Sequence, residues 1–302
     1  MRAKASKIII LVLTAFISVG AFVGGICMLI KPDGSLLQMQ NMLPYFQVLP
    51  FADVLFQDYF FSGIALIIVN GVSNLLAFIL ILLNKKAGYI LGTVFGFTLM
   101  LWIIIQFVIF PINALDIIYF TLGVLQLICG YIALVSYCQA HFRFDEADYP
   151  NIDNNSKTLV IYFSRMNYTK RIAYEKAEEL HGDIARLETE ERTQGTLGFW
   201  WCGRFGMHQW GMKTLPLQKD LSSYHRIVIV TPIWVFRMCA PIRDFVTRNE
   251  EILLRKDVEV IFNHFNPWLP KGAVREMGKH VHIVSTISKT TMLGHTFKGK
   301  KR

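Results

Sequence analysis

The stretch that decides the fold of the second half of this chain is residues 157–169, Lys-Thr-Leu-Val-Ile-Tyr-Phe-Ser-Arg-Met-Asn-Tyr-Thr. Its first part, Lys157 to Phe163, is a β-branched and aromatic run and predicts a buried strand. Apolar residues then recur at helical spacing over Thr169–His181. The sequence therefore predicts a strand, a turn and a helix, with the turn from Ser164 to Thr169 placed where α/β folds hold a phosphate.

The same alternation of strands and helices continues towards the C-terminus. Four more strands are predicted at Asp183–Leu187, Arg226–Val230, Val258–Phe262 and Val281–Ser285, and a helix at Pro241–Asn249. Arg226–Val230 is nearly continuous in Ile and Val, as expected of a strand buried on both faces. We expect an α/β fold with a doubly wound, five-stranded parallel sheet, in which ligands bind in the loops after Phe163, Val230 and Phe262.

The first half of the chain is much more apolar. Four segments are long enough to cross a membrane as helices: Ile8–Ile30, Tyr59–Leu83, Gly88–Phe110 and Leu115–Tyr137. The first segment is longer than the apolar region of a signal peptide and lacks an Ala-x-Ala cleavage site, so we expect it to be retained as a span. We predict a four-helix membrane bundle at 1–144, a linker at 145–156 whose Asp, Asn and Pro content suits an exposed boundary, and the α/β domain at 157–302.

The positions of Lys and Arg beside the spans predict an orientation. One side of the membrane carries Arg2, Lys4, Lys7, Lys85, Lys86 and Arg143, whereas the other carries only Lys31. The positive-inside rule then places both termini and the α/β domain in the cytoplasm, attached to the cell membrane. The chain's net charge of +9 lies in residues 151–302, with 24 Lys and Arg against 15 Asp and Glu. Two interpretations stay open: attraction to an anionic lipid bilayer, or a solvated basic surface.

Several classes of function are disfavoured by what the sequence lacks. The spans contain no Lys or Arg and no obvious broken repeats, which argues against a transporter. No histidine precedes His141, so a membrane haem with paired axial histidines is not expected. The five cysteines show no metal-ligand spacing, so no metal site is predicted. The basic charge is dispersed and no recognition motif is present, so nucleic acid is not an expected partner.

Two motifs in the second half resemble the flavodoxin family. Residues 162–173, Tyr-Phe-Ser-Arg-Met-Asn-Tyr-Thr-Lys-Arg-Ile-Ala, resemble the family's phosphate loop, Tyr-Phe-Ser-x-Thr-Gly-x-Thr followed by Ile-Ala. Residues 231–234, Thr-Pro-Ile-Trp, with residues 241–245 after them, resemble the family's third-strand loop. The resemblance covers residues 157–287 and implies a flavodoxin-like, FMN-binding domain fused to the four spans.

The resemblance also implies which residues hold the cofactor. They belong to three loops: Ser164, Arg165, Met166, Asn167, Tyr168 and Thr169 in the first, Pro232, Ile233, Trp234, Val235 and Phe236 in the second, and Asn263 and His264 in the third.

The first loop departs from the family at two positions. Met166 replaces the usual hydroxyl and Asn167 replaces the usual Gly. Asn tolerates the left-handed backbone, so we expect the turn to be kept. The lost donor should weaken phosphate binding unless Arg165 or Lys170 compensates.

Single residues in the other two loops carry alternative interpretations. Trp234 either packs on the flavin ring or fills the core. His264 either transfers a proton beside the flavin or is structural. Cys239 has no resolving cysteine nearby, and we treat it as an ordinary small residue.

Two segments have no counterpart in the resemblance. Residues 195–213 hold three of the six tryptophans and are predicted to be too rich in Gly for a steady helix. This aromatic insert docks on the bilayer or the membrane half, covers the flavin, or packs on the sheet. After Ser285 no closing helix is expected, and the tail forms at most a brief helix from Lys289.

Two functions follow from these patterns. One is a membrane-anchored FMN oxidoreductase or electron-transfer protein with a membrane-associated acceptor such as a quinone. The alternative is a flavin-free sensory or interaction module on a membrane anchor, favoured by Met166, Asn167 and the altered loop at Asn263. Whether the protein is an enzyme stays open.

Overall fold

Long apolar runs form long helices in the first unit of the chain, residues 1–141. The structure is a computed structural model that describes residues 2–153, 157–266 and 268–297. Its helices are α1 (Arg2–Ile30), α2 (Ala52–Leu55), α3 (Phe60–Leu66), α4 (Ser73–Leu82), α5 (Lys86–Ile109) and α6 (Ala114–Ala140), with a π-helical turn over Ile67–Val72 between α3 and α4. Four helical stretches are long and apolar enough to cross a membrane: Ala5–Ile30, Phe60–Leu82, Lys86–Ile109 and Ala114–Ala140. They coincide with the four predicted segments.

Two buried side-chain amides, Gln126 and Asn74, join helices of this first unit. The Nε2 of Gln126 in α6 donates to Asn74 Oδ1 in α4 at 2.8 Å and to the Gly92 carbonyl in α5 at 2.9 Å. Asn74 Nδ2 in turn donates to the carbonyl of Asn70, within the π-helical turn, at 2.9 Å. The side chains of Gln126 and Asn74, which form this amide cluster, are fully buried. Since hydrocarbon offers no replacement partner, this amide cluster favours one alignment of the three helices.

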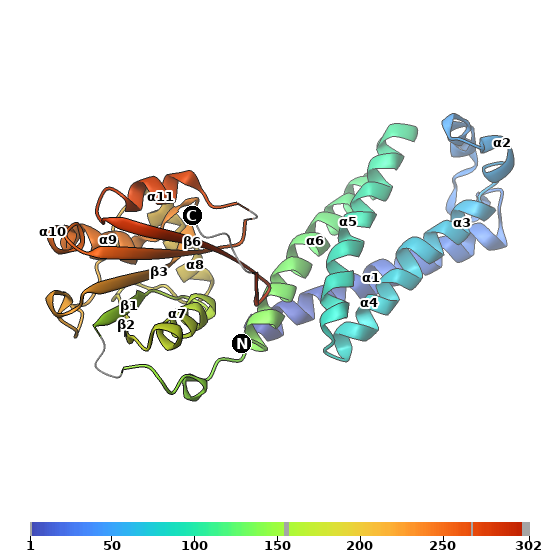
Figure 1. The fold of residues 1–302 in the computed structure, drawn as a ribbon. Helices are drawn as coiled ribbons and strands as arrows, with labels where there is room; N and C mark the ends of the chain where they lie inside the picture. Colours follow the sequence, from blue (N-terminus) through green and yellow to red (C-terminus); the bar gives the residue numbers. More distant parts are fainter. Residues whose placement is uncertain (1, 154–156, 267, 298–302) are drawn as a thin grey trace. The chain divides into compact units, whose positions relative to one another are not determined.

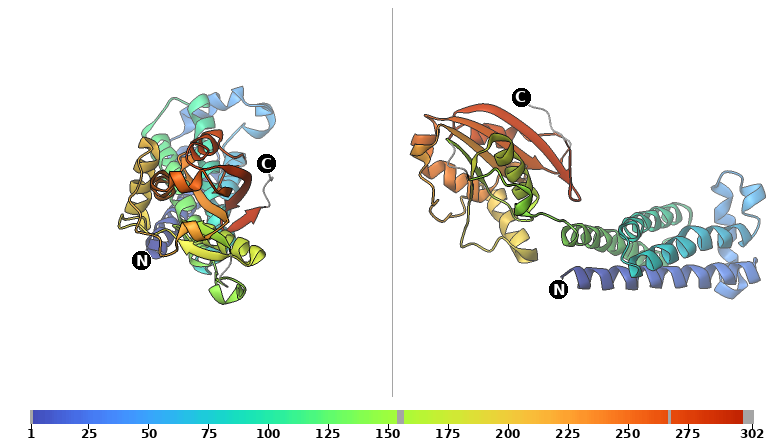
Figure 2. Two further views of the ribbon diagram at one scale, coloured as in Figure 1. Left: turned by 60° about the vertical axis from the view of Figure 1, so that its left-hand side comes forward. Right: turned by 60° about the horizontal axis from the view of Figure 1, so that its bottom comes forward.

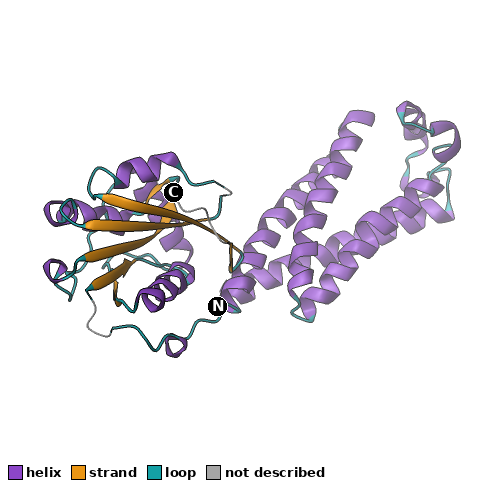
Figure 3. Cartoon of the chain, viewed as in Figure 1, coloured by secondary structure: helices purple, strands orange, loops and turns teal. Residues whose placement is uncertain are grey.

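The strands all lie in the second unit, residues 142–302 (Figures 1 and 3). They are β1 (Thr158–Tyr162), β2 (Asp183–Arg186), β3 (Arg226–Trp234), β4 (Arg237–Met238), β5 (Asp257–His264), β6 (Ile283–Met292) and β7 (His295–Phe297). The sheet order is β2-β1-β3-β5-β6-β7, with β4 paired to β3. The five predicted strands pair in parallel, while β4 and β7 are antiparallel additions, so the sheet is mixed and larger than predicted.

Helices cover both faces of this sheet (Figure 1). Helix α7 (Tyr168–Leu180) packs Ile172, Ala173 and Ala177 on one face. Helices α9 (Ala240–Arg248), α10 (Glu250–Leu253) and α11 (Lys271–Met277) contribute to the core on the other. The segment after α6 also joins the α7 face through Phe144, Tyr149 and Ile152. Residues 154–156, the end of the predicted linker, lie outside the described residues.

Two predictions about irregular segments were wrong. The aromatic insert is a helix, α8 (Gly195–His208), because close packing outweighs the low helix propensity of glycine. A Cβ on Gly206 would lie 3.1 Å from Val235 Cγ2, so glycine allows α8 to approach the end of β3. The tail forms no helix at Lys289. Instead β6 continues to Met292, and Leu293 and Gly294, with φ of 50° and 86°, turn the chain back into β7 (Figure 2).

Replacing Gln126 with Leu should destabilise the first unit by about 1 kcal/mol, because Asn74 and the Gly92 carbonyl lose their donor in a dry environment. The measurement is the unfolding midpoint of the detergent-solubilised protein in a denaturing-detergent titration. Gln106→Leu is the matched control, since Gln106 is half-buried and no side-chain hydrogen bond of it is found among the described residues. Equal midpoints for the two variants would contradict a bonding role for Gln126.

Candidate functional site

The turn after β1 holds a buried hydroxyl that has no partner. Ser164 is 5% exposed, and its Oγ makes no hydrogen bond within the described residues. A buried hydroxyl usually finds a partner, since an unpaired one costs about 1–3 kcal/mol. Ser164 sits where β1 ends and the chain turns towards α7, the position predicted for a phosphate.

The turn itself has the backbone conformation expected from the sequence. Asn167 adopts the left-handed region, with φ of 63°, as predicted for an Asn in place of Gly. It precedes the thirteen-residue α7, yet its side chain makes no capping hydrogen bond. Asn167 thus does not supply the side-chain acceptor that an N-cap residue often gives, and the positive end of the helix dipole faces this turn.

Thr169 links this turn to the far side of the sheet. Its hydroxyl accepts a hydrogen bond from Asn263 Nδ2 of β5 at 3.1 Å, which leaves the hydroxyl proton available for donation. Asn263 Oδ1 accepts from Thr291 of β6 at 2.7 Å, and Thr291 lies 3.1 Å from Thr296 of β7. Arg171 of α7 donates to Thr296 at 2.9 Å and closes the network. The β6–β7 hairpin therefore holds Thr169 in position through Asn263.

Two other side chains of the first loop contact neighbouring segments, and a third is exposed. Arg165 lies over the Phe199 ring of α8, 5.3 Å from its centroid, and donates to the Gly195 carbonyl at 3.4 Å. Met166 is 37% exposed. Tyr168 packs edge-on against Phe142, the second residue after α6, with ring centroids 4.7 Å apart.

Lys170 is engaged outside the loop. Its ammonium pairs with Glu146 and lies 4.8 Å from the Phe144 ring centroid. Lys170 and Arg165 are the two cations expected to replace the donor lost at Met166. Lys170 thus contacts the segment after α6, and Arg165 contacts α8.

The second loop is a strained hairpin turn. β3 and β4 are joined by Val235 and Phe236 alone, with φ of 48° and 60°. Such turns normally use Asn-Gly, because β-branched and bulky residues are strained at positive φ. Both side chains are exposed, by 43% and 56%. Pro232, Ile233 and Trp234, by contrast, belong to β3 and are half-buried.

Trp234 packs in the core of the domain. Its ring meets Phe163 edge-on, with centroids 5.6 Å apart, and it also contacts the cluster formed by Cys202, Met212 and Ala240. This placement fits the interpretation that Trp234 fills the core. Phe236 is the exposed aromatic side chain of the second loop.

Asn263 and His264 lie within β5, not in a loop after it. His264 is 5% exposed, with Nδ1 2.9 Å from the Asn266 carbonyl and Nε2 2.8 Å from Ser288 Oγ. Burial lowers the pKa of His264, partly opposed by the bond to the Asn266 carbonyl. Both ring nitrogens are occupied, which fits the structural interpretation. Pro267, which follows Asn266, lies outside the described residues.

Cys239 is also placed as an ordinary small residue. It is fully buried beside Thr231, with Sγ and Oγ1 3.4 Å apart. Burial raises the pKa of the Cys239 thiol to about 12, so the reactive thiolate is disfavoured.

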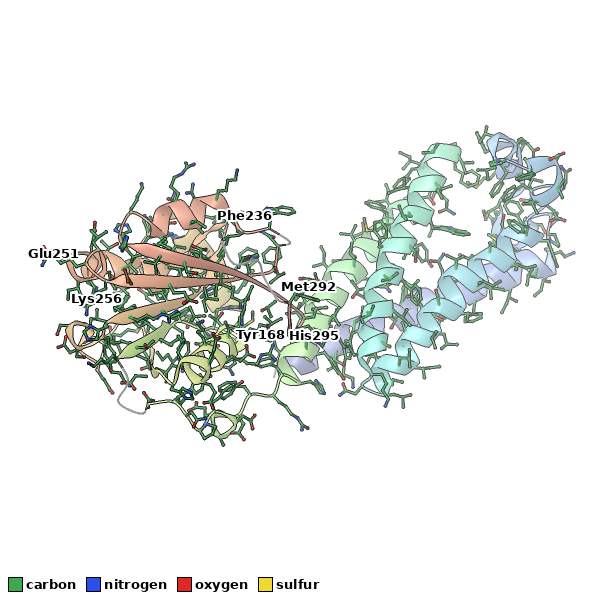
Figure 4. All side chains as sticks on the ribbon, in the orientation of Figure 1. Tyr168, Phe236, Glu251, Lys256, Met292 and His295 are labelled. Atoms are coloured by element: carbon green, nitrogen blue, oxygen red, sulfur yellow. The ribbon has the colours of Figure 1, made fainter. Side chains whose placement is uncertain are left out.

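The structure brings the first and third loops together through Thr169 and Asn263, and the first and second through Phe163 and Trp234. Tyr168, Met292 and His295 gather at the same end of the sheet (Figure 4). Sequence reasoning missed Thr291, Thr296 and Arg171. The available signal was the β-branched run Thr286–Thr291, which is typical of a strand.

A surface hollow of about 490 Å³ lies at the other end of the sheet, where Figure 4 labels Glu251 and Lys256. Its lining is mostly polar and charged, and Lys256 there donates to the backbone carbonyl of Ser222 at 3.0 Å. None of the predicted site residues lines it.

The lowered pKa of His264 predicts a pH effect on stability. The unfolded chain binds the proton near pH 6.5 and the folded chain only at lower pH, so stability is full above about pH 6.5 and falls on acidification. His264→Gln should flatten the decline in unfolding midpoint between about pH 6.5 and 5. His225→Gln, at an exposed position, is the control and should keep the wild-type slope. An unchanged slope in His264→Gln would count against this assignment.

The strained turn predicts a stabilising substitution. Val235→Asn should raise stability by about 1 kcal/mol, because Asn tolerates positive φ. Thermal unfolding of the solubilised protein measures this. Val284→Asn in β6, at a similarly exposed valine without positive φ, should be neutral or destabilising. A loss of stability in Val235→Asn would show that Val235 contributes more by packing than it costs in strain.

No family model matches this chain, and no curated protein matches it. The chain is similar to a flavoprotein from Lactobacillus acidophilus NCFM crystallised in complex with FMN, at 17% identity over 43% of this chain and 91% of that chain, with a TM-score of 0.38. It is also similar to proteins described as flavoproteins from Bacteroides eggerthii (18% identity, 44% and 87% covered, TM-score 0.38) and Bacteroides uniformis (19%, 45% and 92%, 0.39).

Proposed function

We propose that this protein is a membrane-anchored, flavodoxin-like FMN-binding protein that passes electrons to a membrane-associated acceptor such as a quinone. The observation that carries the proposal is the unpartnered, buried hydroxyl of Ser164 in the turn before α7, whose N-cap residue Asn167 makes no side-chain capping bond. A phosphate monoester supplies what this turn lacks, namely a dianionic acceptor for a hydroxyl and for helix amides.

The chain's own residues divide the work of binding. Ser164 and Thr169 donate hydroxyl protons to the phosphate, and the backbone amides at the start of α7 add to them. Asn263 holds the Thr169 oxygen, so the remaining proton of that hydroxyl is directed to the ligand. Phe236, exposed at the rigid turn after β3, is the aromatic side chain available to the flavin ring. The bound FMN would supply the electron-transfer chemistry.

The membrane half and the charge suggest where this activity takes place. Four helices long and apolar enough to span a membrane precede the domain. The lysines and arginines beside them favour a cytoplasmic domain with both termini inside. A net +9 on residues 151–302 favours a membrane-proximal or anionic partner.

A flavin-free interaction module on the same anchor is the second candidate. It is favoured by Met166 in place of a hydroxyl and by the cations: Lys170 pairs with Glu146, and Arg165 lies over Phe199. Neither cation is free to replace the lost donor without giving up these contacts.

Titrating FMN into the apoprotein in detergent separates the two candidates, because bound flavin changes its fluorescence. We expect saturable binding, weakened about tenfold or more in Ser164→Ala, since a hydrogen bond to a charged group contributes roughly 1.5–3 kcal/mol. Thr169→Asp should abolish binding by repulsion between the carboxylate and the phosphate.

Ser285→Ala is the matched control. Ser285 also has a buried hydroxyl without a partner, but it lies in β6 beside Glu259, near the amino end of the sheet. Its loss should leave FMN affinity unchanged. If the wild-type protein gives no saturable signal, FMN binding is excluded and the flavin-free module stands.

A further inference from the structure

Helix α8 is apolar on two sides. Its inner side, Gly198, Cys202, Phe205 and Gly206, faces the domain, where Cys202 and Phe205 pack with Met212, Ala240 and Trp234. A surface helix of a soluble protein usually turns a polar side to water. The outer side of α8 does not follow this rule.

The outer side carries large exposed apolar groups. We call Leu197, Trp200, Arg204 and Met207 the outer stripe, because their spacing of three, four and three residues places them on one side of the helix. Leu197 is 59%, Trp200 69% and Met207 63% exposed. Phe199, Trp201 and Trp210 flank the stripe and are also exposed. Large apolar side chains that gather exposed on one side of a helix indicate an interaction site.

The polar groups of the stripe match a bilayer surface. The guanidinium of Arg204 lies 5.6 Å from the ring centroids of both Trp201 and Trp210. Residues 195–213 contain no Asp or Glu, whereas Arg204 and Lys213 supply positive charge. Tryptophan rings prefer the headgroup level, and basic residues there are attracted to anionic lipids.

The stripe is held rigidly on the domain. Arg243 of α9, which is 7% exposed, donates to the Trp210 carbonyl at 2.8 Å and pairs with Glu276. The Met212 amide donates to the Ala240 carbonyl at 3.0 Å. A fixed surface loses little conformational entropy when it binds.

We propose that the outer stripe of α8 docks the domain on the headgroup region of an anionic bilayer. A bilayer is the partner that the chain favours, because four helices long and apolar enough to span one lie in the same polypeptide. The connection is short, since Phe142 already packs on Tyr168 two residues after α6 ends. The proposal does not depend on FMN binding.

Contact quenching by brominated lipids tests this docking. The full-length protein carries Trp102→Phe, which removes the tryptophan of α5, and Trp268→Phe, which removes an exposed tryptophan outside α8. It is placed, one chain per disc, in nanodiscs of phosphatidylcholine and phosphatidylglycerol with or without bromine near the headgroup end of the acyl chains. We expect bromine to lower tryptophan emission by roughly a third or more, because three of the four remaining tryptophans lie in residues 195–213.

Leu197→Glu with Met207→Glu should remove most of this quenching without changing a tryptophan, because carboxylates on the stripe are repelled by anionic lipid. The control pair, Ile252→Glu with Leu254→Glu, changes exposed apolar residues at the other end of the sheet and should leave quenching intact. The proposal is overturned by absence of quenching, by equal quenching in the stripe variant, or by equal loss in the control pair. Quenching that appears only with two chains per disc would assign the stripe to self-association instead and overturn it as well.

Discussion

The parallel pairing of β1, β3 and β5 is the constraint on which the second unit depends. Tyr162 lies beside Val230, and Val230 beside Ile261, so the carboxyl ends of the three strands lie at the same end of the sheet. Parallel strands need crossover connections, so the chain must turn at the carboxyl end of each strand. As a result, one end of the sheet holds the Ser164 turn, the Val235–Phe236 turn and Asn263. About 100 residues separate the first of these from the last in sequence.

At this end of the sheet, the Ser164 turn is supported by the β6–β7 hairpin and by the segment after α6. The β6–β7 hairpin reaches Thr169 through Thr291 and Asn263, and Arg171 binds the same hairpin. The segment after α6 contacts the other flank, where Phe142 meets Tyr168. A turn fixed from both sides is preorganised, so a ligand that binds it loses little affinity to ordering.

Much of this architecture could be predicted because it rests on periodicity and length. Continuous apolar runs indicated the four spans, and β-branched runs indicated β1, β3, β5 and β6, while β2 was predicted at Asp183–Leu187. The left-handed Asn167 followed from the tolerance of Asn for that backbone. These features depend on local sequence, which a pattern records directly.

What could not be predicted depends on tertiary contacts. Glycine disfavours a helix on its own, yet Gly206 lets α8 pack against Val235, which no local pattern shows. The core position of Trp234 and the two hydrogen bonds of His264 required knowledge of Phe163, Asn266 and Ser288 in space. The unpartnered state of Ser164 is likewise a property of the folded chain alone.

The amide cluster of the first unit has a consequence for the order in which its helices assemble. Asn74 is synthesised some fifty residues before Gln126, which donates to its side chain and to the Gly92 carbonyl. Until α6 is synthesised, Asn74 Oδ1 and the Gly92 carbonyl lack this donor. The last long helix of the first unit, α6, therefore completes the hydrogen bonds of the amide cluster.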